Sequence, residues 1–253
     1  MKTGIVTNEH MTMLRIAARM DESRSYIRNY NPGCSQKELK AKAWEEQWFG
    51  FIPESIFIRL MPALYNRFGK YPEMISVLQQ WMDTGLEGFD FKLICNLHIQ
   101  LSDPYYRWLS GDYIPDRLKN GLNEITSATT AFDFKRRFEK NIKSNTLKHL
   151  AVNLLDTATD TGLLKGATQK FVQTPPISAL FFGYLIFTLG SFGFPMADLI
   201  DSPFIKSIVN DKSRLRTLLT DGQHKRYWEY DWDMNLFNLK LLYPTIDDWF
   251  KET

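Results

Sequence analysis

Apolar residues recur at spacings of three and four along most of the chain, which is the period of an amphipathic helix. In the first half, stop signals such as Asn31-Pro32-Gly33 and Gly85 interrupt this period. The pattern predicts helices over residues 11–27, 35–48, from 53 onward, 72–84, 91–101 and 102–109. Ser35 and Glu38 have the spacing of a capping box at the start of the second of these helices. Short loops between the helices predict a compact bundle.

The pattern loosens around residues 111–123, where Gly111, Pro115, Gly121 and Asn123 fall close together. Clustered turn residues of this kind predict a domain boundary. We therefore expect a helical bundle over residues 1–122 and a second domain over residues 123–253.

The second part begins with the pattern of two helices and a tight turn. We expect one helix over residues 131–142, capped by Thr130 and Asp133, a turn at 143–145, and a second helix capped by Ser144 or Asn145. Gly162 should end the second helix, and a short β-hairpin should follow before residue 175. The apolar stripe of the second helix is Leu147, Leu150, Ala151, Leu154, Leu155 and Ala158. This order predicts a winged helix-turn-helix.

The remaining segment alternates between a strongly apolar stretch and a polar tail. Residues 171–197 carry no charge, but prolines and glycines interrupt them, and the apolar part over 177–189 is about 13 residues, the length of a core helix rather than a membrane span. The tail predicts a short helix ending at Gly222, two strands over 227–230 and 236–239, and a last helix over 246–251. The predicted fold class is mainly α with small β-hairpins.

Composition narrows the setting and the class of partner. The chain has 253 residues, of which 44% are hydrophobic and 14% aromatic, so it can bury a sizeable core. The net charge is only +2, so binding to nucleic acid would need a local basic patch. Two cysteines, Cys34 and Cys95, fit a reducing compartment, and residues 1–19 lack the apolar core of a signal peptide. We expect a cytoplasmic protein.

No pattern of residues points to catalysis. His10, His98, His149 and His224 are scattered, and none has the spacing of a metal-ligand motif. His98 lies in an apolar run and is expected to be a core residue. Nucleophile elbows and phosphate-binding glycine loops are absent from the sequence. The sequence therefore predicts a protein without catalytic residues, cofactor, metal or small-molecule substrate.

The chemistry that does stand out is positive charge on the predicted helix-turn-helix. Residues 135–148 hold six basic side chains against one acid, Glu139. A recognition helix enters the major groove by its N-terminal end, and flanking cations neutralise phosphates. The predicted DNA contacts are Lys135, Arg136, Arg137, Lys140, Lys143, Asn145, Thr146, Lys148, His149, Lys165 and Lys170. A basic face that is merely solvated, or a protein-docking surface, would show the same pattern.

Several short motifs resemble the BrxA family of the BREX phage-resistance systems of bacteria. They are Asp103-Pro104-Tyr105-Tyr106-Arg107 within 96–109, the helix and turn over 145–166, Ile177-Ser178 after Pro175-Pro176, and Asp201-Ser202-Pro203. The resemblance implies a NusB-like N-terminal bundle, winged-helix-like elements after it, and binding to double-stranded DNA beside other defence proteins. It supplies no catalytic residues.

Two alternatives stay open at the level of sequence. The chain could be an adaptor that docks other defence proteins without touching nucleic acid. It could also bind RNA through the NusB-like bundle.

Overall fold

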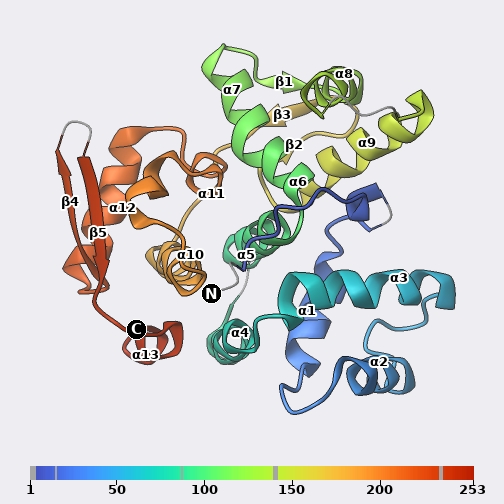
Figure 1. Cartoon of the computed structure of the whole chain (residues 1–253), viewed down its shortest axis with the longest axis horizontal. Helices are drawn as coiled ribbons and strands as arrows, with labels where there is room; N and C mark the ends of the chain where they lie inside the picture. The colour runs from blue at the N-terminus through green and yellow to red at the C-terminus, as the bar shows by residue number, and fades with distance from the viewer. Residues whose placement is uncertain (1–3, 15, 87, 139–141, 234–235) are drawn as a thin grey trace.

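The computed structural model describes residues 4–253 except 15, 87, 139–141 and 234–235. The protein is mainly helical, as the apolar period predicts (Figure 1). Its first part comprises the 3-10 turn η1 (Thr12–Leu14), α1 (Met20–Asn29), α2 (Gln36–Glu45), α3 (Glu54–Leu64), the π-helical turn η2 (Tyr65–Gly69), α4 (Pro72–Thr84) and α5 (Gly88–Ser102).

Local signals fix several of these helix ends where the sequence predicts them. The capping box of Ser35 and Glu38 opens α2. Pro72 occupies the first turn of α4, and Gly85 ends that helix with φ at 112°, a conformation that glycine adopts without strain. The structure confirms these ends. They could be predicted because each depends on residues within one turn of the helix end.

The predicted first helix is wrong in its N-terminal half. Residues 16–19 are not helical, and α1 begins only at Met20. The buried guanidinium group of Arg67, on η2, donates to the carbonyl oxygens of Ala18 at 2.8 Å, Ala17 at 2.9 Å and Ile16 at 3.2 Å. Those carbonyls are therefore satisfied by a residue distant in sequence, and the helix is not needed to pair them.

The middle of the chain forms a compact unit of helices and a small sheet. It comprises α6 (Pro104–Trp108), the π-helical turn η3 (Leu109–Tyr113), α7 (Ile114–Lys119), β1 (Glu124–Ile125), α8 (Ser127–Phe138), α9 (Ser144–Asp160), β2 (Leu164–Lys165) and β3 (Lys170–Val172). The antiparallel sheet has the order β1-β3-β2, with Glu124 opposite Phe171 and Leu164 opposite Val172.

Residues 111–123, where the apolar pattern loosens, are largely helical, through η3 and α7. Gly111 does not make a turn: it allows close packing, because a Cβ there would lie 2.3 Å from the Cβ of Pro203. The predicted boundary at 122 falls in the short connection between α7 and β1.

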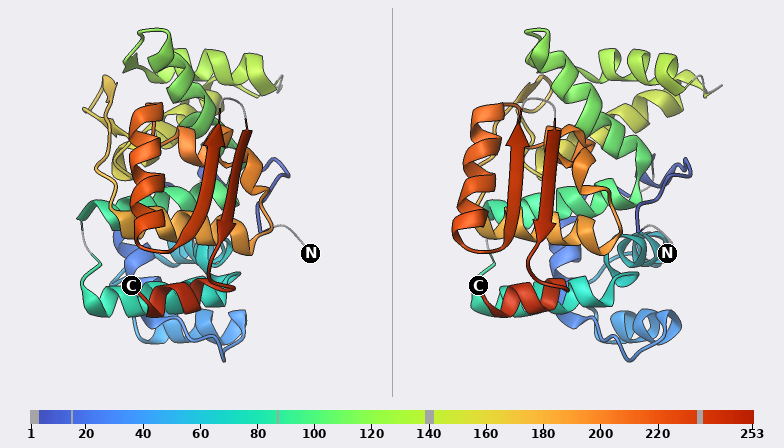
Figure 2. Two further views of the ribbon diagram at one scale, coloured as in Figure 1. Left: turned by 90° about the vertical axis from the view of Figure 1, so that its left-hand side faces the viewer. Right: turned by 60° about the vertical axis from the view of Figure 1, so that its left-hand side comes forward.

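The last part surrounds a central apolar helix. It comprises α10 (Ala179–Ser191), the 3-10 turn η4 (Met196–Asp201), α11 (Pro203–Lys206), α12 (Lys212–His224), β4 (Trp228–Asp233), β5 (Leu236–Leu241) and α13 (Ile246–Lys251). Strands β4 and β5 form an antiparallel ribbon beside α12, clearest in Figure 2. The predicted hairpin and final helix are confirmed, whereas Gly222 lies inside α12 and does not end it.

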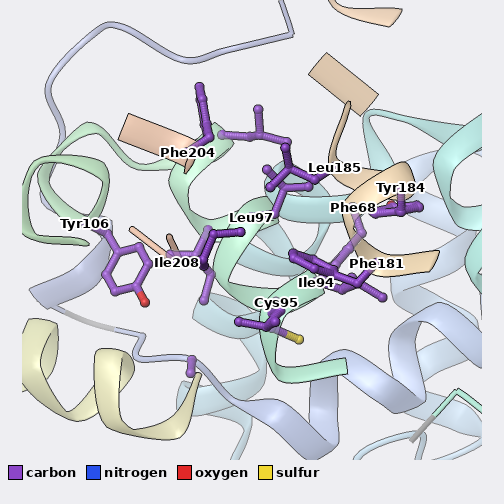
Figure 3. Packing of buried hydrophobic residues seen from close by; sticks show 14 of the residues in the cluster. Phe68, Ile94, Cys95, Leu97, Tyr106, Phe181, Tyr184, Leu185, Phe204 and Ile208 are labelled. Carbon is purple, nitrogen blue, oxygen red and sulfur yellow. The ribbon is translucent and has the colours of Figure 1, made fainter. Parts of the chain in front are cut away.

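The core is continuous across the chain. Helix α5 is buried on nearly all sides, and α10 packs against it with residues 181–189 fully covered. Figure 3 shows Ile94 and Leu97 of α5 packed among Phe68, Phe181 and Leu185. The predicted core helix is thus confirmed, and none of the helices in the described residues is both long and apolar enough to cross a bilayer.

Candidate nucleic-acid interface

Helix α8 is held by an aromatic cluster on its inner side. The rings of Phe134 and Phe138 lie 4.8 and 4.9 Å from the ring of Tyr105, both edge-on. The helix begins at Ser127, four residues before the predicted start, and Thr126 and Thr129 exchange hydrogen bonds there. The predicted caps Thr130 and Asp133 therefore lie inside the helix. This docking leaves the opposite side of α8 free for charged side chains.

Three of those side chains are the predicted cations Lys135, Arg136 and Arg137, and all three are exposed. The Arg136 side chain is 77% exposed, and its Nη2 lies 3.5 Å from Asp133 Oδ1. An ion pair that open to solvent contributes little and is easily exchanged for a phosphate. Lys140, also predicted as a contact, lies outside the described residues.

Helix α9 presents two distinct sides. Its predicted apolar stripe, from Leu147 to Ala158, is buried as expected and packs partly on α8. Outside the stripe, Lys143, Asn145, Lys148 and His149 are exposed, and Thr146 is partly so. The first two turns of α9, at the end of the helix next to α8, thus carry Asn145, Thr146, Lys148 and His149 of the predicted contacts.

The predicted cap of α9 is wrong. Ser144 and Asn145 lie in the first turn, and the cap position is Lys143, with no side-chain cap hydrogen bond in the described residues. The amides of the first turn of a helix lack intrahelical partners and carry a partial positive charge. The start of α9 therefore combines open amide donors with exposed cations, which favours an anion.

The two lysines of the β2–β3 hairpin have different roles. Lys165 is exposed. Lys170 is buried: its Nζ lies 3.0 Å from Asp156 Oδ1 of α9 and donates to the Gly166 carbonyl oxygen at 3.1 Å. Lys170 thus ties the hairpin turn to α9, and its charge is already balanced by Asp156. Of the two, Lys165 is the one without an ion pair among the described residues, so its charge is available to a ligand.

A cleft between α7 and α8 adds charges that sequence reasoning missed. It has a volume of about 920 Å³, and its lining includes Trp108 and Tyr113. Its charged walls are formed by Arg117, Arg136, Arg137 and Lys206 together with Asp112, Asp116 and Asp133. Burial raises the pKa of Asp112 above its ordinary value, and nearby cations, Lys206 and Arg137 among them, partly offset this. The positive charges of Arg136 and Arg137 are therefore partly offset by the acidic residues of the cleft. Lys143 and Lys148, at the start of α9, do not line this cleft.

Cations from the C-terminal part of the chain do not form one surface with those of α8 and α9. Lys206 shares the cleft with Arg136 and Arg137. On α12, Arg214 donates to the Pro175 carbonyl oxygen at 2.6 Å, and the Arg216 guanidinium lies 4.5 Å from the centre of the Trp232 ring. Figure 1 places α12 on the opposite side of the molecule from α8 and α9. No sequence signal connects Lys206 to α8, because the contact depends on the packing of α11.

The histidine in the apolar run is a core residue, as predicted. His98 is fully buried, with Nδ1 2.7 Å from the Arg67 carbonyl oxygen and Nε2 2.7 Å from the Tyr184 hydroxyl. Burial lowers the pKa of His98 from 6.5 to about 4. Among the residues that the structure describes, three or more acidic, histidine or cysteine side chains never gather as a metal site would require.

Comparison with models of known protein families finds no match, and neither does comparison with curated proteins. What the chain binds must therefore be inferred from the charge and geometry of its own residues.

Proposed function

We propose that the chain is a non-catalytic accessory protein that binds double-stranded DNA in a BREX-type phage-defence system. The observation that carries this proposal is the start of α9, where helix amides without a side-chain cap lie beside the exposed Lys143 and Lys148. Phosphate groups are the ligands that such a surface favours. The resemblance to the BrxA family supports the defence setting.

The order of elements supports a winged-helix-like reader. Strand β1, helices α8 and α9, and strands β2 and β3 follow one another, and the sheet order is β1-β3-β2. In this proposal α9 is the recognition helix and the turn between Lys165 and Lys170 is the wing. The helices up to and including α7 belong to the proposed NusB-like bundle.

Binding should depend on phosphates more than on base sequence. Lysine and arginine contacts to phosphate release counterions, so affinity falls steeply with salt. The exposed side of α9 has no arginine to make bidentate contacts with guanine. Duplexes of unrelated sequence should therefore bind with similar affinity.

A variant in which three exposed cations are replaced by alanine tests the proposed DNA binding. K135A/R136A/K148A should weaken binding to every duplex and reduce the slope of log affinity against log salt by about 2 to 3, one for each lost phosphate contact. Fluorescence anisotropy with two unrelated duplexes at several salt concentrations measures both quantities. K70A/K240A/K251A removes three exposed lysines from other elements and is the matched control.

Two outcomes would contradict the proposal. One is equal affinity for the α8–α9 triple variant and the control. The other is capture of protein partners that resists nuclease while duplex DNA fails to bind, which would favour the adaptor alternative. RNA duplexes of equal length that outcompete DNA would favour the RNA alternative.

A further inference from the structure

The corner formed by α2 and α3 exposes an unusual amount of apolar surface. Trp44 is 46% exposed and Phe51 is 93% exposed. A small pocket of about 150 Å³ lies among Trp44, Phe51 and neighbouring residues of the loop that follows α2. Large apolar side chains grouped on a surface mark a site of association.

The local backbone explains why Phe51 projects. The loop after α2 turns through Gln47 and Gly50, which have φ of 53° and 66° in the left-handed region. On the inner side of α2 only Leu39 and Ala43 are buried, and the Trp44 ring rests 4.9 Å from the Phe57 ring. Helix α2 is therefore a peripheral element whose outer side meets solvent.

One stripe of that outer side has a self-complementary order of charges. Lys37, Ala41 and Glu45 are spaced four residues apart, so they form one stripe along the helix, and all three are exposed. The stripe is basic at its start, small at its centre and acidic at its end. No ion pair of Lys37 or Glu45 occurs within the part of the chain that the structure describes.

We propose that the α2–α3 corner is a homodimer interface in which two α2 helices pack antiparallel about a two-fold axis near Ala41. This arrangement sets Lys37 of each copy opposite Glu45 of the other, and the small Ala41 side chains allow the helices to approach. Trp44 and Phe51 then lose their exposed apolar area to the partner copy. A second copy of the chain is the partner whose charges complement this stripe.

The interface is independent of the proposed DNA surface. Figures 1 and 2 place α2 at one end of the molecule and α8 and α9 at the other. Failure of either proposal would therefore leave the other unchanged.

Reversing the charges of Lys37 and Glu45 tests whether the two residues meet between copies of the chain. Lys37 and Glu45 are two turns apart on one helix, so they do not touch within a chain. K37E and E45K should each raise the dimer dissociation constant roughly tenfold, because each creates two like-charge pairs at the axis. K37E/E45K should restore the wild-type constant. Sedimentation equilibrium over roughly 1 to 100 µM covers the micromolar range expected of a small interface.

Mixing the single variants sharpens the test. K37E and E45K combined in equal amounts should form a heterodimer more tightly than either forms a homodimer, since every pair across the axis is then of opposite charge. F51S should also raise the dissociation constant, whereas L236S, at a residue 80% exposed on β5, should not. Circular dichroism checks that each variant keeps its helix content.

The result expected is a concentration-dependent dimer that follows this charge pattern. A chain that stays monomeric throughout the concentration range would overturn the proposal, and so would a dimer that is indifferent to both K37E and E45K.

Discussion

His98 shows how burial makes one residue sensitive to pH. A carbonyl oxygen only accepts, so Nδ1 donates to Arg67 and Nε2 accepts from the Tyr184 hydroxyl, which fixes the neutral tautomer. The pKa of His98 is about 4 when folded and near 6.5 when unfolded. As pH falls below 6.5, the unfolded chain binds the proton first. The residue's contribution is thus lost progressively between pH 6.5 and 4.

The His98→Gln variant tests this reasoning. At pH 7 it should be less stable than wild type, because it disturbs two buried hydrogen bonds. At pH 4 the gap in unfolding free energy should narrow by about 3 kcal/mol, the size of the pKa shift at 1.36 kcal/mol per unit. Urea unfolding followed by tryptophan fluorescence at both pH values measures the gap. An equal gap at pH 7 and pH 4 would show that His98 is not a buried neutral group.

Individual side chains also mark the limit of sequence reasoning at the candidate site. The sequence shows which residues are cations, and most of the predicted ones on α8 and α9 are exposed. It does not show which cations are already paired. Lys165 and Lys170 look alike in the predicted hairpin, yet the partner of Lys170, Asp156, comes from α9 through tertiary packing.

Helix α12 and strand β4 illustrate packing at the scale of elements. Gly222 lies in the last turns of α12, and a Cβ there would be 1.9 Å from Cζ2 of the fully buried Trp228 on β4. Glycine is usually unfavourable in a helix by about 1 kcal/mol relative to alanine. Here the missing side chain lets the strand lie directly on the helix, so the usual preference is reversed.

Gly222→Ala should therefore destabilise the protein despite its better helix propensity. Overpacking of a filled site costs about 2 kcal/mol beyond that gain. Asp221→Ala changes the neighbouring exposed residue and should alter stability by less than about 0.5 kcal/mol. Chemical denaturation of the three proteins compares them directly. A Gly222→Ala protein as stable as wild type would mean that Trp228 does not pack as described.

Elements were predictable where their ends depend on nearby residues. The capping box of α2, the proline and glycine of α4, and the limits of α13 are all local signals, and the structure agrees with them. The prediction of element bounds failed where a residue distant in sequence determines the local structure. Arg67 donates hydrogen bonds to the carbonyl groups of the residues that would extend α1 toward the N-terminus. Gly111 is a glycine because Pro203 packs where a side chain would lie.

The whole molecule is bound together across the predicted boundary at residue 122. Tyr184 of α10 reaches His98 of α5 at 2.7 Å, and Thr161 reaches Tyr106 of α6 at 2.8 Å. Gln100 and Ser207 share a buried hydrogen bond of 2.8 Å. Buried polar groups of this kind are costly when they lose their partners. Each half of the chain therefore depends on the other for both apolar cover and hydrogen bonds.

This dependence predicts how the two predicted domains behave when separated. Fragments 1–122 and 123–253 expressed alone should each lack a cooperative thermal transition, because α5 and α10 are covered by one another. Expressed together, they should associate and regain a single transition, since the exposed core surfaces remain complementary. Calorimetry and co-purification measure these outcomes. A fragment 1–122 that unfolds cooperatively by itself would instead show that the N-terminal bundle is an autonomous domain, and that the hydrogen bonds from Tyr184, Thr161 and Ser207 add stability without being required for folding.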